Sequence, residues 1–219
     1  MTTIFVTSSG TDIGKTYVSA MLIRQLREAG RPVRAIKPIV SGLDEASFAA
    51  SDPAALLAAL GEPVAYDNAE HVSRWRFTAA LSPDMAASRE GAAIDFAELV
   101  NHCKAREALH DPLVIEGVGG LMVPLDQTHT VLDWMLALKS PAFVPLLVVG
   151  SYLGTISHTL TTLDVMRRND LAPRAIVVSE SLSNPVPLEE TVETIARFAT
   201  CDTRAVARGG EADLAGLFA

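Results

Sequence analysis

The stretch from Thr7 to Thr16, TSSGTDIGKT, constrains this chain more than any other part of its 219 residues. It follows the apolar run Ile4–Val6, which indicates a strand, and it opens a segment in which apolar residues recur at helical spacing. This layout is typical of a phosphate-binding loop, because unpaired N–H groups at a helix N-terminus attract an anion. We expect Lys15 to reach the terminal phosphates and the Thr16 hydroxyl to bind Mg²⁺.

The loop departs from the strict phosphate-binding pattern at one position. That pattern requires a glycine five residues before Gly14, where Ser9 stands, and the nearest glycine is Gly10. Since Gly-Lys-Thr is a common tripeptide, its place between a strand and a helix carries the prediction. The alternative is an ordinary strand–helix turn with a surface lysine.

Composition excludes several classes of protein. Nearly half of the residues are apolar, and the net charge of −8 is opposite to the excess of Lys and Arg that nucleic-acid binding requires. The two cysteines, Cys103 and Cys201, are far apart and outside any metal-ligand spacing, which favours a reducing compartment. With neither a long apolar run nor a signal-like N-terminus, we expect a cytoplasmic protein that binds neither membrane nor nucleic acid.

Strands that are continuous apolar runs alternate with helices along the chain, which predicts an α/β fold with a mostly parallel central sheet and helices on both faces. The expected strands are 3–7, 32–39, a short one at 75–77, 113–115, 143–149 and 175–178. The expected helices are 15–29, 52–60, one opening at Pro83, 95–108, 131–138, 155–168 and 188–198. We find no internal repeat or linker and predict one domain over residues 1–219. The pattern assigns no element to residues 208–219, which we expect to be loosely held.

Polar or glycine-rich residues follow four of the expected strands, at the edge where ligands bind in open α/β sheets. Glu116 ends an apolar strand and precedes glycines, which predicts a metal-binding acid approached closely by a ligand; a solvated carboxylate is the alternative. Asp52 stands before a proline, so it is expected as a helix cap and also as a metal ligand. Thr16, Asp52 and Glu116 are an adequate oxygen donor set for Mg²⁺.

Lys37 lies near the end of the second expected strand, and Ser41 follows that strand closely. A buried lysine needs an anionic partner, and we expect a phosphate to be that partner; a lysine extending from the strand end to solvent is the alternative. The five histidines show no ligand spacing, and no Ser-His-Asp or Cys-His arrangement is present.

Taken together, these motifs resemble those of the dethiobiotin synthetase family of P-loop NTPases over roughly Ile4 to Val178. The matching motifs are Thr11-x-x-Gly14-Lys15-Thr16, Lys37-Pro38-x-x-Ser41-Gly42, Ser51-Asp52, Leu81-Ser82-Pro83, Glu116-Gly117-x-Gly119-Gly120-x-x-x-Pro124-Leu125, Asp133-Trp134 and Val149-Gly150-x-x-Leu153-Gly154-x-Ile156-x-His158. Their order and spacing together make the resemblance specific.

The resemblance implies a cyclo-ligase of biotin biosynthesis that uses ATP and Mg²⁺ to join CO₂ to 7,8-diaminopelargonate. A substrate carbamate would attack the γ-phosphate, and the second amine would close the ring on the mixed anhydride. The protein would act as a homodimer on small-molecule substrates. Catalysis would rest mainly on positioning and on cancelling negative charge.

The resemblance also assigns roles to residues. Lys15 and Lys37 would be catalytic, and Thr16, Asp52 and Glu116 would hold the metal. The nucleotide would contact Asp12, Ile13, Gly14, Lys15, Thr16, Tyr17, Asp52, Glu116, Gly117, Val118, Gly119, Ser179 and Glu180. The substrate would contact Ser41, Gly117, Val118, Gly150, Leu153 and Gly154.

The chain departs from the family where the base would bind. The family often has Asn-Asp after the last central strand, where Ser179-Glu180 stands here, and the Arg208-Gly209-Gly210 tail replaces a proline-rich segment. Other nucleoside triphosphates therefore remain open beside ATP.

Two other functions are open. A related ATPase of amidoligase or partitioning type is the first, although a partitioning ATPase would usually carry a second lysine early in the loop, near Ser9 and Thr11. A non-catalytic nucleotide-binding paralogue is the second, against which the presence of Lys15, Lys37 and Glu116 argues.

Overall fold

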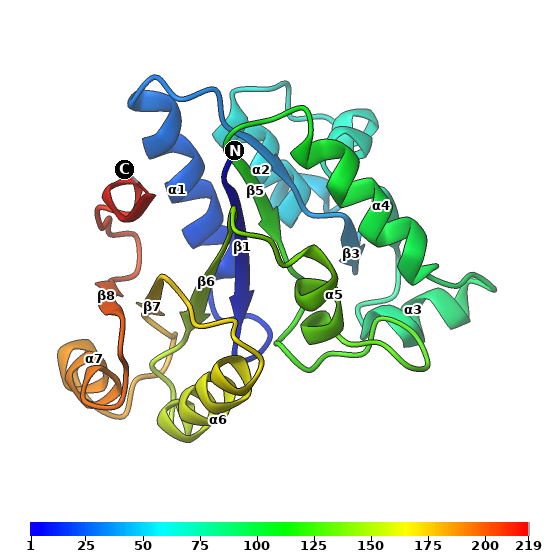
Figure 1. Ribbon diagram of the computed structural model, residues 1–219. Coiled ribbons are helices and arrows are strands. Elements are labelled where there is room, and N and C mark those ends of the chain that lie inside the picture. The colour runs from blue at the N-terminus through cyan, green and yellow to red at the C-terminus, as the bar shows by residue number, and fades with distance from the viewer. Residues whose placement is uncertain (219) are drawn as a thin grey trace.

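The computed structural model describes residues 1–218 and is built around a parallel sheet (Figure 1). Six strands lie in the order β2-β5-β1-β6-β7-β8, and every neighbouring pair is parallel. These strands are β1 (Thr3–Ser8), β2 (Arg34–Ile36), β5 (Leu113–Glu116), β6 (Phe143–Val149), β7 (Ala175–Ser179) and β8 (Asp202–Val206). A separate parallel pair is formed by β3 (Ile39–Ser41) and β4 (Trp75–Phe77).

Helices cover both faces of the large sheet, which confirms the predicted fold class (Figure 1). Alternate residues of β1 separate the two layers, since Ile4 and Val6 face one apolar cluster and Phe5 faces the other. One cluster includes α1 (Lys15–Glu28) and α2 (Asp52–Leu60). The other includes α3 (Pro83–Arg89), α4 (Phe96–Glu107), α5 (Val131–Leu138), α6 (Thr155–Arg168) and α7 (Leu188–Ala196). Short 3₁₀ turns span Phe48–Ala50, Tyr66–His71 and Ala215–Phe218.

The expected strand 32–39 is two strands in two different sheets. β2 ends at Ile36 and β3 begins at Ile39, so the chain leaves the large sheet at Lys37-Pro38. The Lys37 N–H donates to the carbonyl of Val72 at 2.8 Å, and the Pro38 carbonyl accepts from the N–H of Trp75 at 2.8 Å. The predicted single strand is therefore wrong, because these bonds turn the chain toward β4.

Strand β8 has no counterpart among the expected elements. Asp202–Val206 lies at the edge of the sheet and pairs only with β7. Its residues are exposed or half-buried except for the last one, so it lacks the apolar run that marks the inner strands. Helix α7 also ends earlier than expected, at Ala196.

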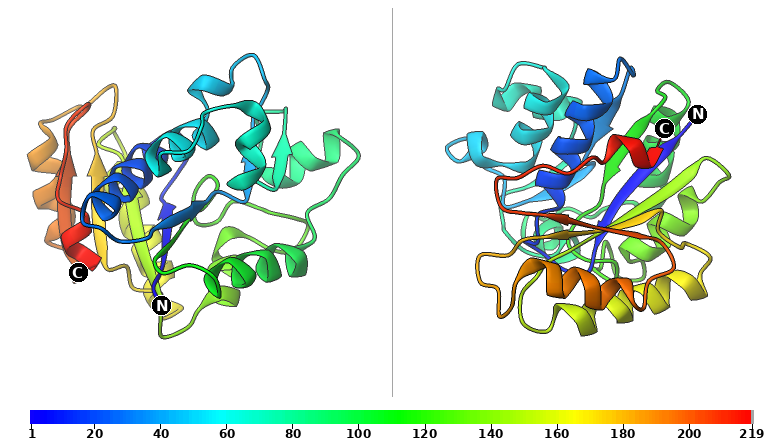
Figure 2. Two further views of the ribbon diagram at one scale, coloured as in Figure 1. Left: turned by 90° about the horizontal axis from the view of Figure 1, so that it is seen from above. Right: turned by 90° about the vertical axis from the view of Figure 1, so that its left-hand side faces the viewer.

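The C-terminal segment lies beside α1 (Figure 2). The Gln25 side chain donates to the Ala212 carbonyl at 2.8 Å and accepts from the N–H groups of Leu214 and Ala215 at 2.8 and 3.1 Å. Leu214 is fully buried. The part of 208–219 that the structure describes is thus attached to α1 by a side chain of that helix.

Within residues 1–218, no helix combines the length and the apolar character that crossing a membrane requires.

We expect Gln25→Ala to release the C-terminal segment, because three backbone groups lose their partner. The free energy of unfolding should fall by about 1–3 kcal/mol, and limited proteolysis should cut between 207 and 214 faster than in the wild type. Gln127→Ala, at an exposed loop position, is the control. Equal cleavage of the two variants would contradict the proposed attachment.

Candidate active site

The loop between β1 and α1 is shaped to expose the first turn of the helix. Gly14 caps α1 with φ of 92°, a left-handed conformation that suits glycine, and a Cβ at this position would collide with the Ser179 side chain. The N–H of Val18 is the first to bond back to the loop, to the Gly14 carbonyl at 3.0 Å. The N–H groups of the preceding turn therefore point out of the helix end, where an anion would bind.

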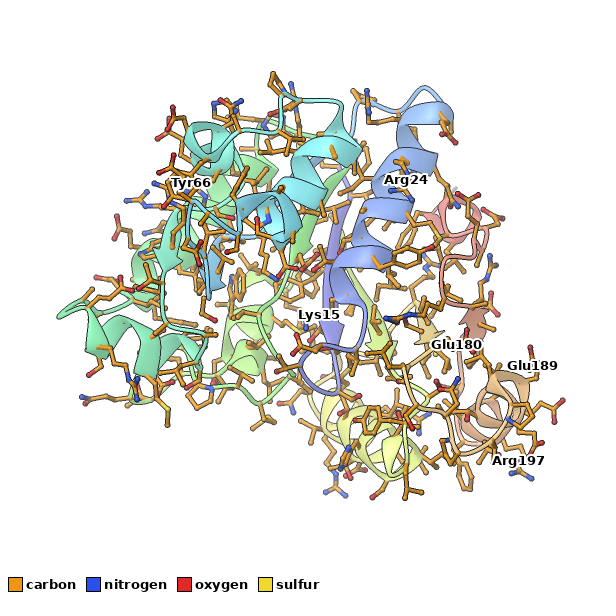
Figure 3. All side chains as sticks on the ribbon, turned by 180° about the vertical axis from the view of Figure 1, so that it is seen from behind. Lys15, Arg24, Tyr66, Glu180, Glu189 and Arg197 are labelled. Atoms are coloured by element: carbon orange, nitrogen blue, oxygen red, sulfur yellow. The ribbon has the colours of Figure 1, made fainter. Side chains whose placement is uncertain are left out.

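Lys15 lies at the start of α1 with its side chain buried inside the loop (Figure 3). Its Nζ donates to the Ser8 hydroxyl at 3.1 Å and to the Gly10 carbonyl at 3.4 Å. Burial, assisted by the nearby charge of Lys37, lowers the pKa of Lys15 from 10.5 to about 8. The ammonium group is held by neutral oxygens only, so a phosphate would be a much stronger partner.

Lys37 lies between two carboxylates at the carboxyl end of the sheet. Its Nζ is 2.5 Å from Asp52 Oδ2 and 2.7 Å from Glu116 Oε1, and its side chain is 5% exposed. Burial acts to lower the pKa of Lys37, but Glu116 and Asp52 outweigh it and raise that pKa above its ordinary value. Burial likewise acts to raise the pKa of Asp52, and Lys37 outweighs it and lowers that pKa. Lys37 and Asp52 are therefore both charged at neutral pH.

The three predicted metal ligands lie together beside Lys37. Thr16 Oγ1 is 2.7 Å from both Asp52 Oδ1 and Glu116 Oε1. One hydroxyl proton satisfies only one of these oxygens, and Glu116 Oε2 is buried without a hydrogen-bond partner. Nowhere in residues 1–218 do three His, Cys, Asp or Glu side chains form a metal-binding group. The donor set here is a hydroxyl and two carboxylates, which suits Mg²⁺ when phosphate oxygens complete the shell.

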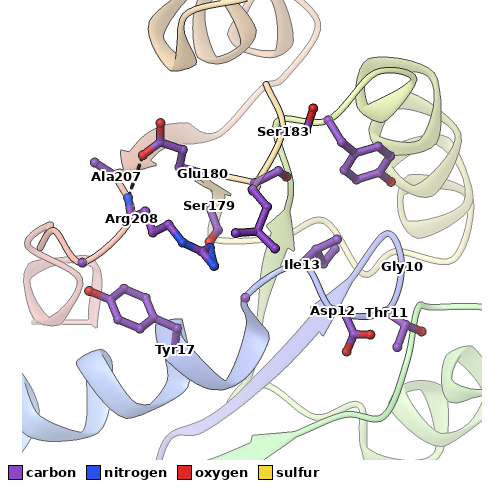
Figure 4. A pocket seen from close by; sticks show the side chains of 15 residues that line it. Gly10, Thr11, Asp12, Ile13, Tyr17, Ser179, Glu180, Ser183, Ala207 and Arg208 are labelled. Carbon is purple, nitrogen blue, oxygen red and sulfur yellow. Dashed lines mark hydrogen bonds between the residues drawn. The ribbon is translucent and has the colours of Figure 1, made fainter. Parts of the chain in front are cut away.

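Two adjacent pockets share residues 11–14 and Tyr17 as a common wall. The first, of about 380 Å³, also contains Lys15, Thr16, Lys37, Ser41, Asp52, Val118 and Gly119. The second, of about 730 Å³, also contains Tyr152, Ser179, Glu180, Ser181, Ser183 and Arg208 (Figure 4). We call them the phosphate pocket and the outer pocket. The loop residues Asp12, Ile13 and Gly14 thus separate the charged cluster from a larger, more apolar space.

The carboxylate of Glu180 accepts two hydrogen bonds from residues of the protein itself. It accepts from the Arg208 N–H at 2.8 Å and from the Asn184 side-chain amide at 3.0 Å. The side chain of Arg208 extends into the pocket between Tyr17 and Ser179 (Figure 4). No asparagine is among the described residues that line this pocket, so a base would meet Tyr17, Ser179 and Arg208 instead.

The predicted substrate residues fall into two groups. Ser41 and Val118 line the phosphate pocket, as does Gly119 of the predicted nucleotide contacts. Gly117 does not, and its N–H donates to the Val6 carbonyl at 2.9 Å within the sheet.

The second group surrounds the start of α6, outside both pockets. Gly150 directly follows β6, Gly154 caps α6 with φ of 98°, and Leu153 between them is 84% exposed. A single chain therefore does not bring these three residues to the phosphate pocket.

Sequence reasoning missed Ser8 and Tyr152. Ser8 is fully buried, and its hydroxyl bridges Lys15 and the Gly119 carbonyl at 3.1 and 2.8 Å. A hydroxyl ending an otherwise apolar strand was the available signal. Tyr152 donates to or accepts from His158 Nδ1 at 2.9 Å and lines the outer pocket, which no local pattern indicated.

Comparison with known proteins gives a consistent result. A family model described as an AAA domain matches residues 2–207. An ATP-dependent dethiobiotin synthetase from Methylobacterium nodulans is 48% identical over 223 residues, which cover 99% of this chain and 98% of the relative. Another from Acidiphilium cryptum is 46% identical over 199 residues, which cover 90% and 88%. The likeness extends over nearly the whole of both chains.

Solved structures support the fold. The MinC–MinD cell division complex of Aquifex aeolicus matches with a TM-score of 0.55 at 16% identity, covering 99% of this chain and 84% of that chain. A ParA family ATPase from Chlorobium tepidum matches with a TM-score of 0.54 at 11% identity, covering 94% and 84%. At these identities the likeness concerns the fold alone, so it gives the partitioning-type alternative no support.

We expect Lys15→Met to stabilise the ligand-free protein in a pH-dependent way. Because the pKa of Lys15 falls from 10.5 to about 8 on folding, the unfolded chain binds more protons between these pH values, and the wild type gains stability as pH rises. At pH 7 the free energy of unfolding of the variant should exceed that of the wild type by up to about 3 kcal/mol, since each pKa unit corresponds to ~1.4 kcal/mol.

The measurement is denaturant unfolding from pH 7 to 10.5, across which the advantage should shrink toward zero. Lys104→Met, at an exposed position of α4, is the control. A constant difference between Lys15→Met and the wild type would contradict the buried ammonium.

Proposed function

The chain belongs to the family of ATP-dependent dethiobiotin synthetases, and on that premise we propose how its residues carry out the reaction. The activity is the ATP-dependent formation of dethiobiotin, a ligase reaction that makes C–N bonds. The observation that carries the proposal is the contact of Lys37 and Thr16 with both Asp52 and Glu116, at the phosphate pocket and beside the exposed first turn of α1.

The substrates would be 7,8-diaminopelargonate, CO₂ and ATP. One amine attacks CO₂ and loses a proton, which gives a carbamate. A carbamate oxygen then attacks the γ-phosphorus, and the bond from that phosphorus to ADP breaks. The second amine attacks the carbamoyl carbon, phosphate leaves, and the urea ring is closed. Both transfers join or separate anions, so charge cancellation and alignment are the main requirements.

Five groups at the phosphate pocket would meet those requirements. The first-turn N–H groups of α1 would bind phosphate oxygens, and Lys15 would exchange the Gly10 carbonyl for an anionic partner. Lys37 would donate to the oxygens of the γ-phosphate and the carbamate, since it already lies in this pocket beside Ser41. The Ser41 hydroxyl and the backbone at Val118–Gly119 would orient the carbamate.

Thr16, Asp52 and Glu116 would hold Mg²⁺, which supplies neutralisation of the phosphate charge when bound. The unpaired Glu116 Oε2 and the hydroxyl shared by two carboxylates support this assignment. The base would lie in the outer pocket near Tyr17 and Ser179, while Glu180 holds the backbone at Arg208.

We further propose a homodimer. Gly150, Leu153 and Gly154 lie outside the phosphate pocket of their own chain, and Leu153 is exposed. The start of α6 would offer N–H groups to the substrate carboxylate bound across a partner copy. A cytoplasmic location is proposed on the free thiols of Cys103 and Cys201.

We expect phosphate release from ATP to require the diamine and bicarbonate together, because the carbamate is the nucleophile. The measurement is phosphate release in CO₂-depleted buffer with each substrate omitted in turn, and ¹³C-bicarbonate should add one mass unit to the product. Release without the diamine would contradict the carbamate route. Parallel assays with CTP and GTP would show which base the outer pocket accepts.

We expect Lys37→Gln to lower kcat at least about a hundredfold, because a charged donor to the transferred group is lost, while nucleotide affinity changes little. Lys104→Gln, at an exposed site, is the control. Circular dichroism must accompany the assay, since Asp52 and Glu116 lose their shared cation. A folded variant that loses nucleotide binding but keeps its kcat at saturation would overturn this role.

A further inference from the structure

A third pocket, of about 670 Å³, lies away from the phosphate-binding loop. It is bounded by β2 at the edge of the large sheet, by the segment after α2, by the 3₁₀ turn Tyr66–His71, by β4 and by α4. None of its lining residues belongs to the phosphate pocket or to the outer pocket. The reaction described above makes no use of it.

Arginines dominate this pocket. Four of them line it, Arg34, Arg74, Arg76 and Arg106, against the two carboxylates of Glu62 and Glu70. They come from β2, β4, the segment before β4, and α4, so only the folded chain brings them together. The lining of this pocket therefore has more positive than negative side chains, although the protein as a whole has a net charge of −8.

The arginines fall into two kinds. Arg34 pairs with Glu62 at 2.6 Å, and Arg74 pairs with Glu98. Arg76 and Arg106 form no salt bridge with any residue in 1–218. Two guanidinium forks are therefore available to a ligand.

The positive charge of these arginines also affects the pKa of two histidines that line the pocket. Burial lowers the pKa of His102, and the charges of Arg106 and Arg74 lower it further. Burial also lowers the pKa of His110, with additional effects of Arg34 and Arg106. The charge of Arg106 therefore contributes to lowering the pKa of both rings.

We propose that this pocket is a second anion site, which binds a small molecule carrying two or more phosphate groups. Arginine forks match phosphate oxygens in pairs, and unpaired forks on β4 and α4 would hold separate groups of one ligand. The volume admits a small molecule. The proposal is independent of the chemistry in the phosphate pocket.

The test is isothermal titration calorimetry of the full chain with inorganic tripolyphosphate. The wild type should bind at two sites, one at the α1 loop and one at the arginine pocket. Arg76→Gln/Arg106→Gln should keep the first site and weaken the second at least tenfold. The matched control, Arg89→Gln/Arg197→Gln, removes two exposed arginines elsewhere and should keep both sites.

Further arms identify the ligand class. Lys15→Met should weaken only the loop site, which leaves the arginine pocket to be titrated alone. In that background, citrate should bind at least tenfold more weakly than tripolyphosphate, and ADP compared with pyrophosphate shows whether a nucleoside contributes. A single site in the wild type, unchanged binding in Arg76→Gln/Arg106→Gln, or citrate binding equally well would each overturn the proposal.

Discussion

The structure depends on four ionisable side chains that lie close together at the carboxyl end of the large sheet. Lys15 begins α1, Lys37 lies between β2 and β3, Asp52 begins α2 and Glu116 ends β5. A buried charge is costly without a partner of opposite sign. Lys37 has two such partners, Asp52 and Glu116, whereas Lys15 is held by neutral oxygens. The geometry therefore leaves one lysine without a carboxylate and one carboxylate oxygen without a donor. The incomplete pairing is what a nucleotide and a metal ion would complete.

Most of the fold, and the residues at the centre of this cluster, could be predicted from the sequence. The apolar runs that end at Glu116 and Val149 predicted the inner strands β5 and β6 correctly. A strand that is buried on both faces is apolar at nearly every position, which makes it easy to recognise in the sequence. Lys15, Lys37, Asp52 and Glu116 were identified because each follows or precedes a recognisable element. The first three line the phosphate pocket, and Glu116 contacts Lys37 and Thr16 from the buried end of β5.

Other features depend on contacts that no local pattern contains. β8 pairs with a single strand and has half-buried side chains, so its sequence resembles that of a loop. The attachment of the C-terminal segment relies on Gln25, whose partners lie nearly two hundred residues further along the chain. The arginine pocket is assembled from separated segments, and an arginine on a strand or helix is ordinarily a solvated surface residue.

The break at Lys37-Pro38 has a mechanical meaning. The Lys37 backbone is bound to the segment before β4 through Val72, while its side chain is bound to Glu116 of the large sheet. Lys37 therefore links the small sheet to the large one through its backbone and its side chain. A shift of the small sheet relative to the large one has to move Lys37 or break its bonds. The position of the Lys37 ammonium group thus depends on how the two sheets are placed relative to each other, as does the position of Ser41 on β3.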